Sequence, residues 1–163
     1  MSIKISYAKT NNNPSGNIVL FVDEKFNCKN IKKYVSSSEF SYINDLLKAC
    51  DLKKNIFVFE LNSKRKIILI SIKKNIKSFD IENLGAELYS RINYEKKNHY
   101  FINSDTISGK QENFIGHFLH GLKLKSYEFK KYKSKKENKI ISIEVLGVKN
   151  RPSANTQLKF KAL

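Results

Sequence analysis

The sequence lacks the long apolar runs that membrane proteins and secretory precursors need. No stretch approaches the ~18 consecutive apolar residues of a membrane span. The opening residues, MSIKISYAK, have neither the charged region nor the apolar region of a signal peptide. Two cysteines, Cys28 and Cys50, are too few for a disulfide framework. Together these absences predict a cytoplasmic protein that has no membrane partner.

The two cysteines are interpreted as structural rather than reactive. Cys50 continues the apolar face of an expected helix, so a buried free thiol is predicted there. Cys28 lies between Asn27 and Lys29, which gives it electropositive neighbours, but it belongs to no catalytic signature.

Motifs for phosphate binding and for catalysis are also absent. The six glycines form no G-x-G pair, so a loop of converging backbone N–H groups around a phosphate is not expected. No G-x-S-x-G elbow and no H-E-x-x-H zinc motif occurs. His117 and His120 could point the same way from one helix, but two imidazoles are only half of a metal site. We therefore predict no catalytic, cofactor-binding or metal-binding residues, and we interpret these histidines and His99 as partly exposed side chains.

Positive charge, by contrast, is abundant, with a formal net charge of +16. A basic surface can bind nucleic acid, and rings beside lysines, as around Tyr127, Phe129 and Tyr132, are typical of single-strand binding. However, only three of the 31 basic residues are arginine, which makes bidentate contacts with bases. Two interpretations stay open: a solvated lysine coat, or a functional basic patch at 123–136.

Apolar periodicity predicts six strands and three helices in one domain, 1–163. Strands are expected at 3–5, 18–22, 56–61, 67–72, 100–102 and 140–148, and helices at 36–50, at 78–92 and from 108 onward. Because strands alternate with helices, the predicted fold class is α/β, a three-layer sandwich with a mixed, largely parallel sheet.

Local signals predict the helix starts and one strand pairing. Capping-box spacing begins the first helix at Ser36 and the third at Ser108, and Ser78 is expected to cap the second. The turn at 11–16 predicts that the first two strands pair as a hairpin. The third and fourth strands are apolar on successive residues, so both of their faces are expected to be covered.

The third helix is expected to give way to an extended segment. Phe114, Phe118 and Leu122 fall on one face of an amphipathic helix. Farther along, Tyr127 and Phe129 alternate with polar residues, a period that is typical of extended chain.

The same stretch carries a family resemblance. The residues that carry it read as G-x5-Y-x-F-x2-Y-K and are Gly121, Tyr127, Phe129, Tyr132 and Lys133. This resembles the helix end and following segment of the N-terminal domain of leucyl (cytosol) aminopeptidases. The order of elements is also similar, closely over about 55–148 and loosely over the first fifty residues. One departure is the sequence SIKK at 71–74, where family members often carry a glycine-rich turn.

The resemblance implies a macro-domain-like fold and a non-catalytic role. In that family the domain precedes a catalytic domain that holds two divalent ions, zinc or manganese, and removes N-terminal residues from peptides. The N-terminal domain is associated with a homo-hexamer and, in some bacterial members, with DNA binding. The implied partners of this chain are therefore the parent's own catalytic domain, further copies in a hexamer and, weakly, DNA. Peptides would be substrates of the parent, and this domain itself would hold no cofactor.

Two other functions stay open at this point. One is a stand-alone basic module that binds nucleic acid, and the other is an isolated macro-like domain for a small molecule such as ADP-ribose. The missing glycine loops argue against the second. The aminopeptidase hypothesis predicts that the reading frame continues beyond Leu163 for about 300 residues that supply the lysine and carboxylate ligands of two ions. A stop codon there would favour the basic module.

Overall fold

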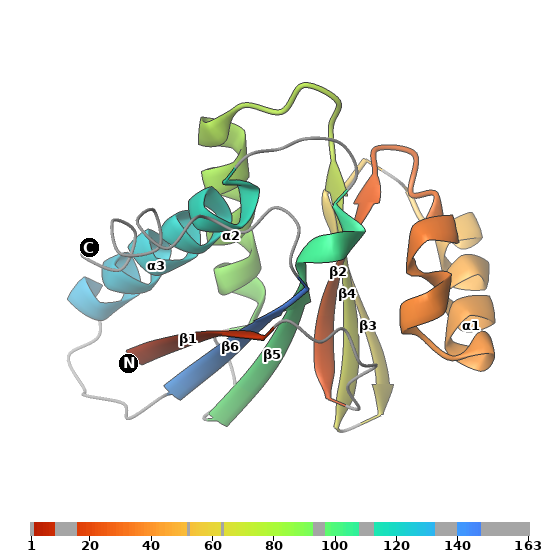
Figure 1. Cartoon of the computed structure of the whole chain (residues 1–163), viewed down its shortest axis with the longest axis horizontal. Helices are drawn as coiled ribbons and strands as arrows, with labels where there is room; N and C mark the ends of the chain where they lie inside the picture. The colour runs from red at the N-terminus through yellow and green to blue at the C-terminus, as the bar shows by residue number, and fades with distance from the viewer. Residues whose placement is uncertain are drawn as a thin grey trace.

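The computed structural model describes residues 2–8, 16–51, 53–62, 64–92, 97–107, 113–132 and 140–147. The strands are β1 (Ser2–Ala8), β2 (Asn17–Asp23), β3 (Ile56–Asn62), β4 (Arg65–Ile72), β5 (Lys97–Asn103) and β6 (Ile140–Leu146). The helices are α1 (Ser37–Ala49), α2 (Ser78–Ile92) and α3 (Phe114–Tyr132), with 3-10 turns η1 (Cys28–Tyr34) and η2 (Ser104–Thr106). This is the predicted order of strands and helices (Figure 1). None of the helices in these ranges is long and apolar enough to cross a membrane.

The six strands form one sheet in the order β1-β6-β5-β2-β4-β3. Every neighbouring pair is parallel except β3 with β4, so the prediction of a mixed, largely parallel sheet is confirmed. The predicted hairpin of the first two strands is wrong. β1 runs in the same direction as β2 and pairs with β6 at the edge of the sheet, whereas a hairpin needs antiparallel neighbours.

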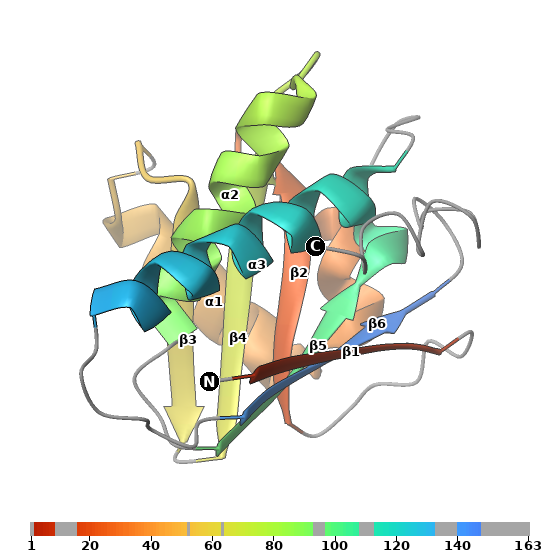
Figure 2. The same ribbon diagram turned by 90° about the vertical axis from the view of Figure 1, so that its left-hand side faces the viewer.

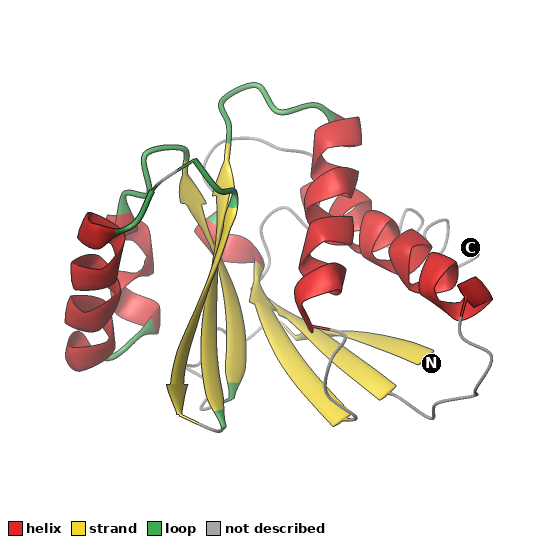
Figure 3. Ribbon diagram, turned by 180° about the vertical axis from the view of Figure 1, so that it is seen from behind, coloured by secondary structure: helices red, strands yellow, loops and turns green. Residues whose placement is uncertain are grey.

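Helices cover both faces of the sheet, which gives three layers (Figures 1 and 3). Successive side chains of a strand point to opposite faces. In β2, Val19 and Phe21 therefore pack with α2 and α3, while Ile18 and Leu20 pack with η1 and α1. The continuous apolar run of β2 thus serves two separate hydrophobic cores.

The expectation of two covered faces holds for β4 but not for β3. All of β4 is buried except the partly buried Lys66. In β3, Ile56 and Phe59 are buried whereas Val58 is exposed. β3 is the last strand of the sheet, and its exposed Val58 lies on the face opposite to Phe57 and Phe59, which pack in the core with η1 and α1.

Helix α1 begins as its sequence predicts. Ser36 and Glu39 form both hydrogen bonds of a capping box, and the Glu39 carboxylate also binds Arg65 of β4, with Oε2 3.0 Å from Nε. The prediction that Cys50 is buried is wrong, because Cys50 is exposed. The chain leaves helical geometry at Cys50, which is the C-cap with extended backbone angles, so its side chain does not continue the apolar face.

Helices α2 and α3 cross at a pair of glycines, and Figure 2 shows the two helices running across each other. A Cβ atom on Gly85 would lie 1.9 Å from the backbone oxygen of Phe118, and one on Gly121 would lie 1.9 Å from that of Glu82. Side chains larger than hydrogen therefore cannot occupy these positions at this separation. The backbone approach fixes α2 against α3 and so sets the position of every residue on α2.

The predicted ends of these two helices need correction. Ser78 is the first helical residue of α2 rather than its cap. Helix α3 begins at Phe114 and continues to Tyr132, so the predicted change to an extended segment is wrong. Leu122 and Ser126, four residues apart, are both buried, which continues the helical face through that stretch. The proposed cap at Ser108 falls outside the described residues.

Candidate functional site

Two places where strands end can be compared as candidate sites, and the first is the edge formed by β2 and β5. These neighbouring parallel strands lead to opposite faces, because β2 continues through η1 to α1 whereas β5 continues through η2 to α3 (Figure 1). In open α/β sheets, ligands bind beyond the carboxyl ends of the strands at such a switch point. We call Asp23 together with residues 103–106 the β2–β5 edge.

Polar side chains at the β2–β5 edge bind the chain's own backbone. The Thr106 hydroxyl accepts the Phe21 N–H at 3.0 Å and donates to the Asn103 carbonyl at 2.8 Å. The Ser104 hydroxyl donates to the Leu146 carbonyl at 2.8 Å, which connects the turn η2 to the end of β6. All of these groups are buried, so the hydrogen bonds remove the cost of placing them away from water.

The turn after β2 is held in the same way. Asp23 Oδ1 accepts the N–H groups of Lys25 and Asn27 at 3.1 and 2.9 Å. The Asp23 carbonyl accepts the N–H of Phe26, which has a positive φ of 55°. These contacts use Asp23 Oδ1 and the Asp23 carbonyl to hold the turn. At this edge Asn103 Nδ2 is the buried side-chain group that finds no hydrogen-bond acceptor among the described residues.

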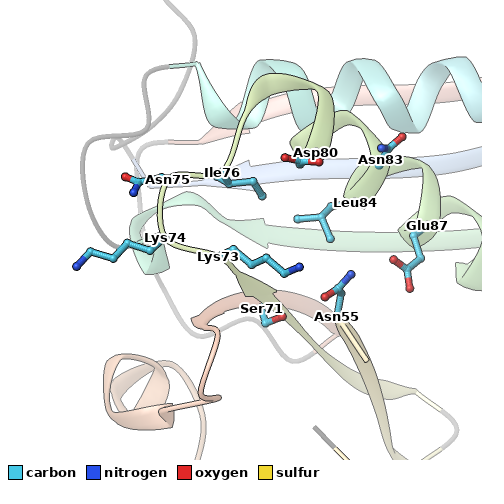
Figure 4. Close-up of a pocket in the computed structure, with 10 residues that line it drawn as sticks. All are labelled: Asn55, Ser71, Lys73, Lys74, Asn75, Ile76, Asp80, Asn83, Leu84 and Glu87. Carbon is cyan, nitrogen blue, oxygen red and sulfur yellow. The ribbon is translucent and has the colours of Figure 1, made fainter. Parts of the chain in front are cut away.

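The second place is a pocket of about 300 Å³ between the carboxyl end of β4 and helix α2, which we call the α2 pocket. Its strand side is formed by Ser71 of β4 and by Asn55, which precedes β3 (Figure 4). The Ser71 N–H donates to the Asn55 carbonyl at 2.8 Å and so fixes these two walls together. The loop 73–76 forms the next side, where Asn75 takes a positive φ of 61° that asparagine tolerates.

Helix α2 supplies the opposite side of the α2 pocket. Asp80, Asn83, Leu84 and Glu87 line it at the i, i+3, i+4, i+7 spacing of one helix face. Leu84 is buried and forms an apolar floor, while the three polar residues stand around it. Among these lining segments, the sequence marks residues 71–74 as a departure from the family pattern. Helical spacing could have placed these four residues on one face, but it does not connect that face with Asn55.

The polar groups of the α2 pocket are largely unused by the chain. The polar lining side chains that form no hydrogen bond or ion pair within the described residues are those of Asn55, Ser71, Lys73, Lys74, Asn75, Asp80 and Asn83. The Glu87 carboxylate lies 3.7 Å from the Arg91 guanidinium, a partly exposed pair of the kind that contributes little to stability. The pocket therefore offers a cation, two carboxylates, amides and a hydroxyl to a ligand.

The histidines do not form a metal centre. Both His117 and His120 approach one carboxylate, with Glu82 Oε1 3.9 Å from His117 Nδ1 and 2.9 Å from His120 Nδ1. No group of three potential ligands is arranged to hold a metal ion in the described ranges. These contacts tie α2 to α3 beside the glycine crossing. His99 lies at a strand start beside Glu144, 3.7 Å away.

Cys28 is a structural thiol. It is buried, and its Sγ donates to the Phe26 carbonyl at 3.4 Å. Burial, with a smaller contribution from the negative charge of Asp23, raises the pKa of the Cys28 thiol to about 11. The thiol is therefore protonated at neutral pH, and the nucleophilic thiolate is scarce.

The basic segment after residue 122 is helical and partly apolar on its surface. Leu124 and Tyr127 are each 43% exposed and lie three residues apart on α3. They form an exposed apolar pair next to Lys123 and Lys125, which are partly buried. Tyr127 is therefore not packed into the core. The side chains beyond it on α3 lie outside the described set.

Comparison with known proteins supports the fold. No protein-family model and no curated protein sequence matches this chain. Among solved structures, a mutant leucine aminopeptidase from tomato is similar over 98% of this chain, with a TM-score of 0.64 and 18% sequence identity. The match covers 35% of that longer chain. The macrodomain of Thermus aquaticus DarG is similar over 90% of this chain and 99% of its own, with a TM-score of 0.54 and 12% identity.

These likenesses confirm the predicted macro-domain-like α/β fold. They also confirm, at the level of the fold, the resemblance to leucyl aminopeptidases that the late helix and the element order suggested. Because sequence identity is below 25% in both cases, the likeness carries over the fold and not the activity. The chain spans about a third of the aminopeptidase chain that it matches.

Proposed function

We propose that this chain forms the non-catalytic N-terminal domain of a metal-dependent leucyl aminopeptidase, whose parent removes N-terminal residues from peptides. One observation carries the proposal: nearly the whole chain shares its fold with about a third of an aminopeptidase chain. The parent's two divalent ions, zinc or manganese, belong in this proposal to a catalytic domain downstream. The domain described here serves the architecture of the enzyme.

The proposed architectural role would explain why apolar side chains of α3 are exposed. Leu124 and Tyr127 present apolar surface in the midst of lysines. Such surface on a charged domain supports contact with the catalytic domain or with another copy. The assembly that we propose for the parent is a homo-hexamer in the cytoplasm. Light scattering on the full-length protein, with and without Leu124→Ser and Tyr127→Ser, measures whether these residues support that assembly.

The native gene provides the first test. Its reading frame should continue after Leu163 with about 300 residues that include a lysine and several carboxylates for two adjacent ions. The full-length protein with added manganese or zinc should release the chromogenic group of a leucine anilide, and the 163-residue chain should not. Turnover by the short chain that survives repurification would contradict the proposal.

The net charge of +16 favours a second, weaker activity, which is sequence-independent binding of DNA. Lysine contacts with phosphates release counterions, so affinity should fall steeply as salt rises. Titration of labelled duplexes from low to physiological salt measures this slope. A tight complex with strong sequence preference at physiological salt would instead support the stand-alone basic module.

A further inference from the structure

The α2 pocket has the properties of a ligand site that the aminopeptidase fold does not explain. Its volume of about 300 Å³ lies at the lower end of the range of small-molecule sites. Its walls come from three separate parts of the chain: Asn55 before β3, Ser71 in β4 and the face of α2. These walls are held by the Ser71–Asn55 backbone hydrogen bond on one side and by the glycine crossing of α2 with α3 on the other.

The arrangement of charge in the α2 pocket indicates the kind of ligand. Lys73 extends along the pocket with its ammonium group towards Asn55 (Figure 4). The carboxylates of Asp80 and Glu87 stand across from it on α2. Lys73 forms no ion pair with either carboxylate. Positive and negative groups that face one space without pairing are complementary to a small molecule that carries both charges.

The apolar part of the lining limits the ligand further. Leu84, which is buried, and Ile76, which is partly buried, are the apolar side chains that line the α2 pocket. No aromatic residue is among its described lining residues, so it lacks the stacking face on which nucleobases bind. The apolar surface suits a short aliphatic side chain.

We propose that the α2 pocket binds a free α-amino acid with an aliphatic side chain, such as leucine. The ligand carboxylate binds Lys73 and the Asn55 amide, and the ligand ammonium group binds Glu87. The aliphatic side chain packs on Leu84. A free amino acid is the product class of the proposed parent enzyme, so a role as a product sensor rests on that proposed function. The proposed binding of the amino acid does not depend on that function.

Calorimetric titration of the 163-residue chain with L-leucine tests the proposal. Leucine should bind one site with a dissociation constant of about 1 mM or tighter. Leucinamide lacks the carboxylate and N-acetyl-leucine lacks the ammonium group, so each should bind at least about tenfold more weakly because one charge-assisted contact is lost. Absence of saturable leucine binding, or binding of either analogue as tightly as leucine, overturns the proposal. Tighter binding of inorganic phosphate or of ribose also overturns it.

Two variants with matched controls locate the site. Lys73→Gln and Glu87→Gln should each weaken leucine binding about tenfold or more. Lys77→Gln removes the same charge from a lysine that does not line the pocket, and Asp45→Asn removes an exposed carboxylate from α1, on the other face of the sheet. Both controls should bind leucine as the unmodified chain does. A loss that is equal in variants and controls would mean that general charge and not the pocket governs binding, and would overturn the proposal.

These outcomes are independent of the aminopeptidase assignment. Leucine binding by a chain whose gene stops after Leu163 would refute the proposed function and keep the site. A full-length aminopeptidase whose N-terminal domain binds no amino acid would keep the function and refute the site.

Discussion

The β2–β5 edge and the α2 pocket lie at the ends of neighbouring strands, yet they use polar residues in opposite ways. At the edge, Thr106, Ser104 and Asp23 bind backbone groups of the chain itself. In the pocket, the side chains of Asn55 and Ser71 bind nothing within the described residues. The edge is where an α/β sheet of this topology is expected to hold ligands. In this chain a larger set of side-chain groups without hydrogen bonds within the described residues lines the pocket one strand away, while at the edge the buried Asn103 Nδ2 is left without an acceptor.

The difference teaches that position in a fold does not assign a site. A polar group whose hydrogen bonds are already made stabilises the fold, and a ligand would have to break those bonds before it could bind. A polar group that faces open space has made no such hydrogen bonds, so a ligand can bind it without breaking any. If this contrast is correct, substitutions at the edge should change stability, and substitutions in the pocket should change binding alone.

Gly121→Ala should have the largest effect, because it should change both the stability of the fold and binding in the α2 pocket. The added Cβ would lie 1.9 Å from the Glu82 backbone oxygen, so α2 must move away from α3. We expect the free energy of unfolding to fall by about 3 kcal/mol or more, measured by urea denaturation. Leucine binding should also weaken, because α2 forms one wall of the pocket. The control Leu124→Ala, at an exposed position of the same helix, should cost less than about 1 kcal/mol. An unchanged urea midpoint would show that the helices do not approach so closely.

Thr106→Val tests the edge directly. The valine has nearly the same shape but leaves the buried N–H of Phe21 without an acceptor. The free energy of unfolding should fall by about 2 kcal/mol. Thr106→Ser keeps the hydroxyl and serves as the matched control. The serine variant shows what loss of the methyl group alone costs. If the valine variant is as stable as the unmodified chain, the hydrogen bond contributes nothing to stability there.

Glu39→Gln extends the comparison to the opposite face of the sheet. Burial raises the pKa of Glu39, but hydrogen bonds from Arg65 and Ser36 outweigh burial and hold the pKa below its ordinary value of 4.5. The ionised carboxylate therefore stabilises the fold above pH 4.5, and this contribution disappears as the pH falls through the lowered pKa. The glutamine variant should be less stable by about 1 kcal/mol at pH 7, and the difference should shrink as the pH falls through the lowered pKa of Glu39. A constant difference at all pH values would contradict this origin.

Ser71→Ala should have the smallest effect on stability. The Ser71 hydroxyl makes no hydrogen bond within the described residues, so the free energy of unfolding should change by less than about 0.5 kcal/mol. Ser104→Ala is the matched substitution at the edge and should cost about 1 kcal/mol, because it removes the hydrogen bond to the Leu146 carbonyl. Equal losses from the two variants, measured by urea denaturation, would remove the distinction between the two regions.

The sequence by itself determined which segments form strands and helices. Three local signals predicted them correctly: the apolar runs of β2 and β4, the capping box of Ser36 and Glu39, and the alternation of strands with helices. These signals can be recognised because they act between residues near in sequence. They were enough to predict the three-layer fold with a largely parallel sheet. They failed where distant contacts decide, as at β1, whose partner β6 lies more than a hundred residues away. They failed also at Tyr127, where buried neighbours keep α3 helical beyond the change of period.

Only the tertiary structure decided where free polar groups gather. Asn55, Ser71 and Glu87 are ordinary residues in three separate segments, and no local pattern connects them. Pairing of β3 with β4 places the first two side by side, and the glycine crossing holds α2 above them. The same physical reason explains the β2–β5 edge, where a hydroxyl at Thr106 meets a backbone N–H at Phe21 that lies 85 residues earlier. Whether a polar residue is satisfied or free depends on such distant partners, and a sequence read locally does not contain them.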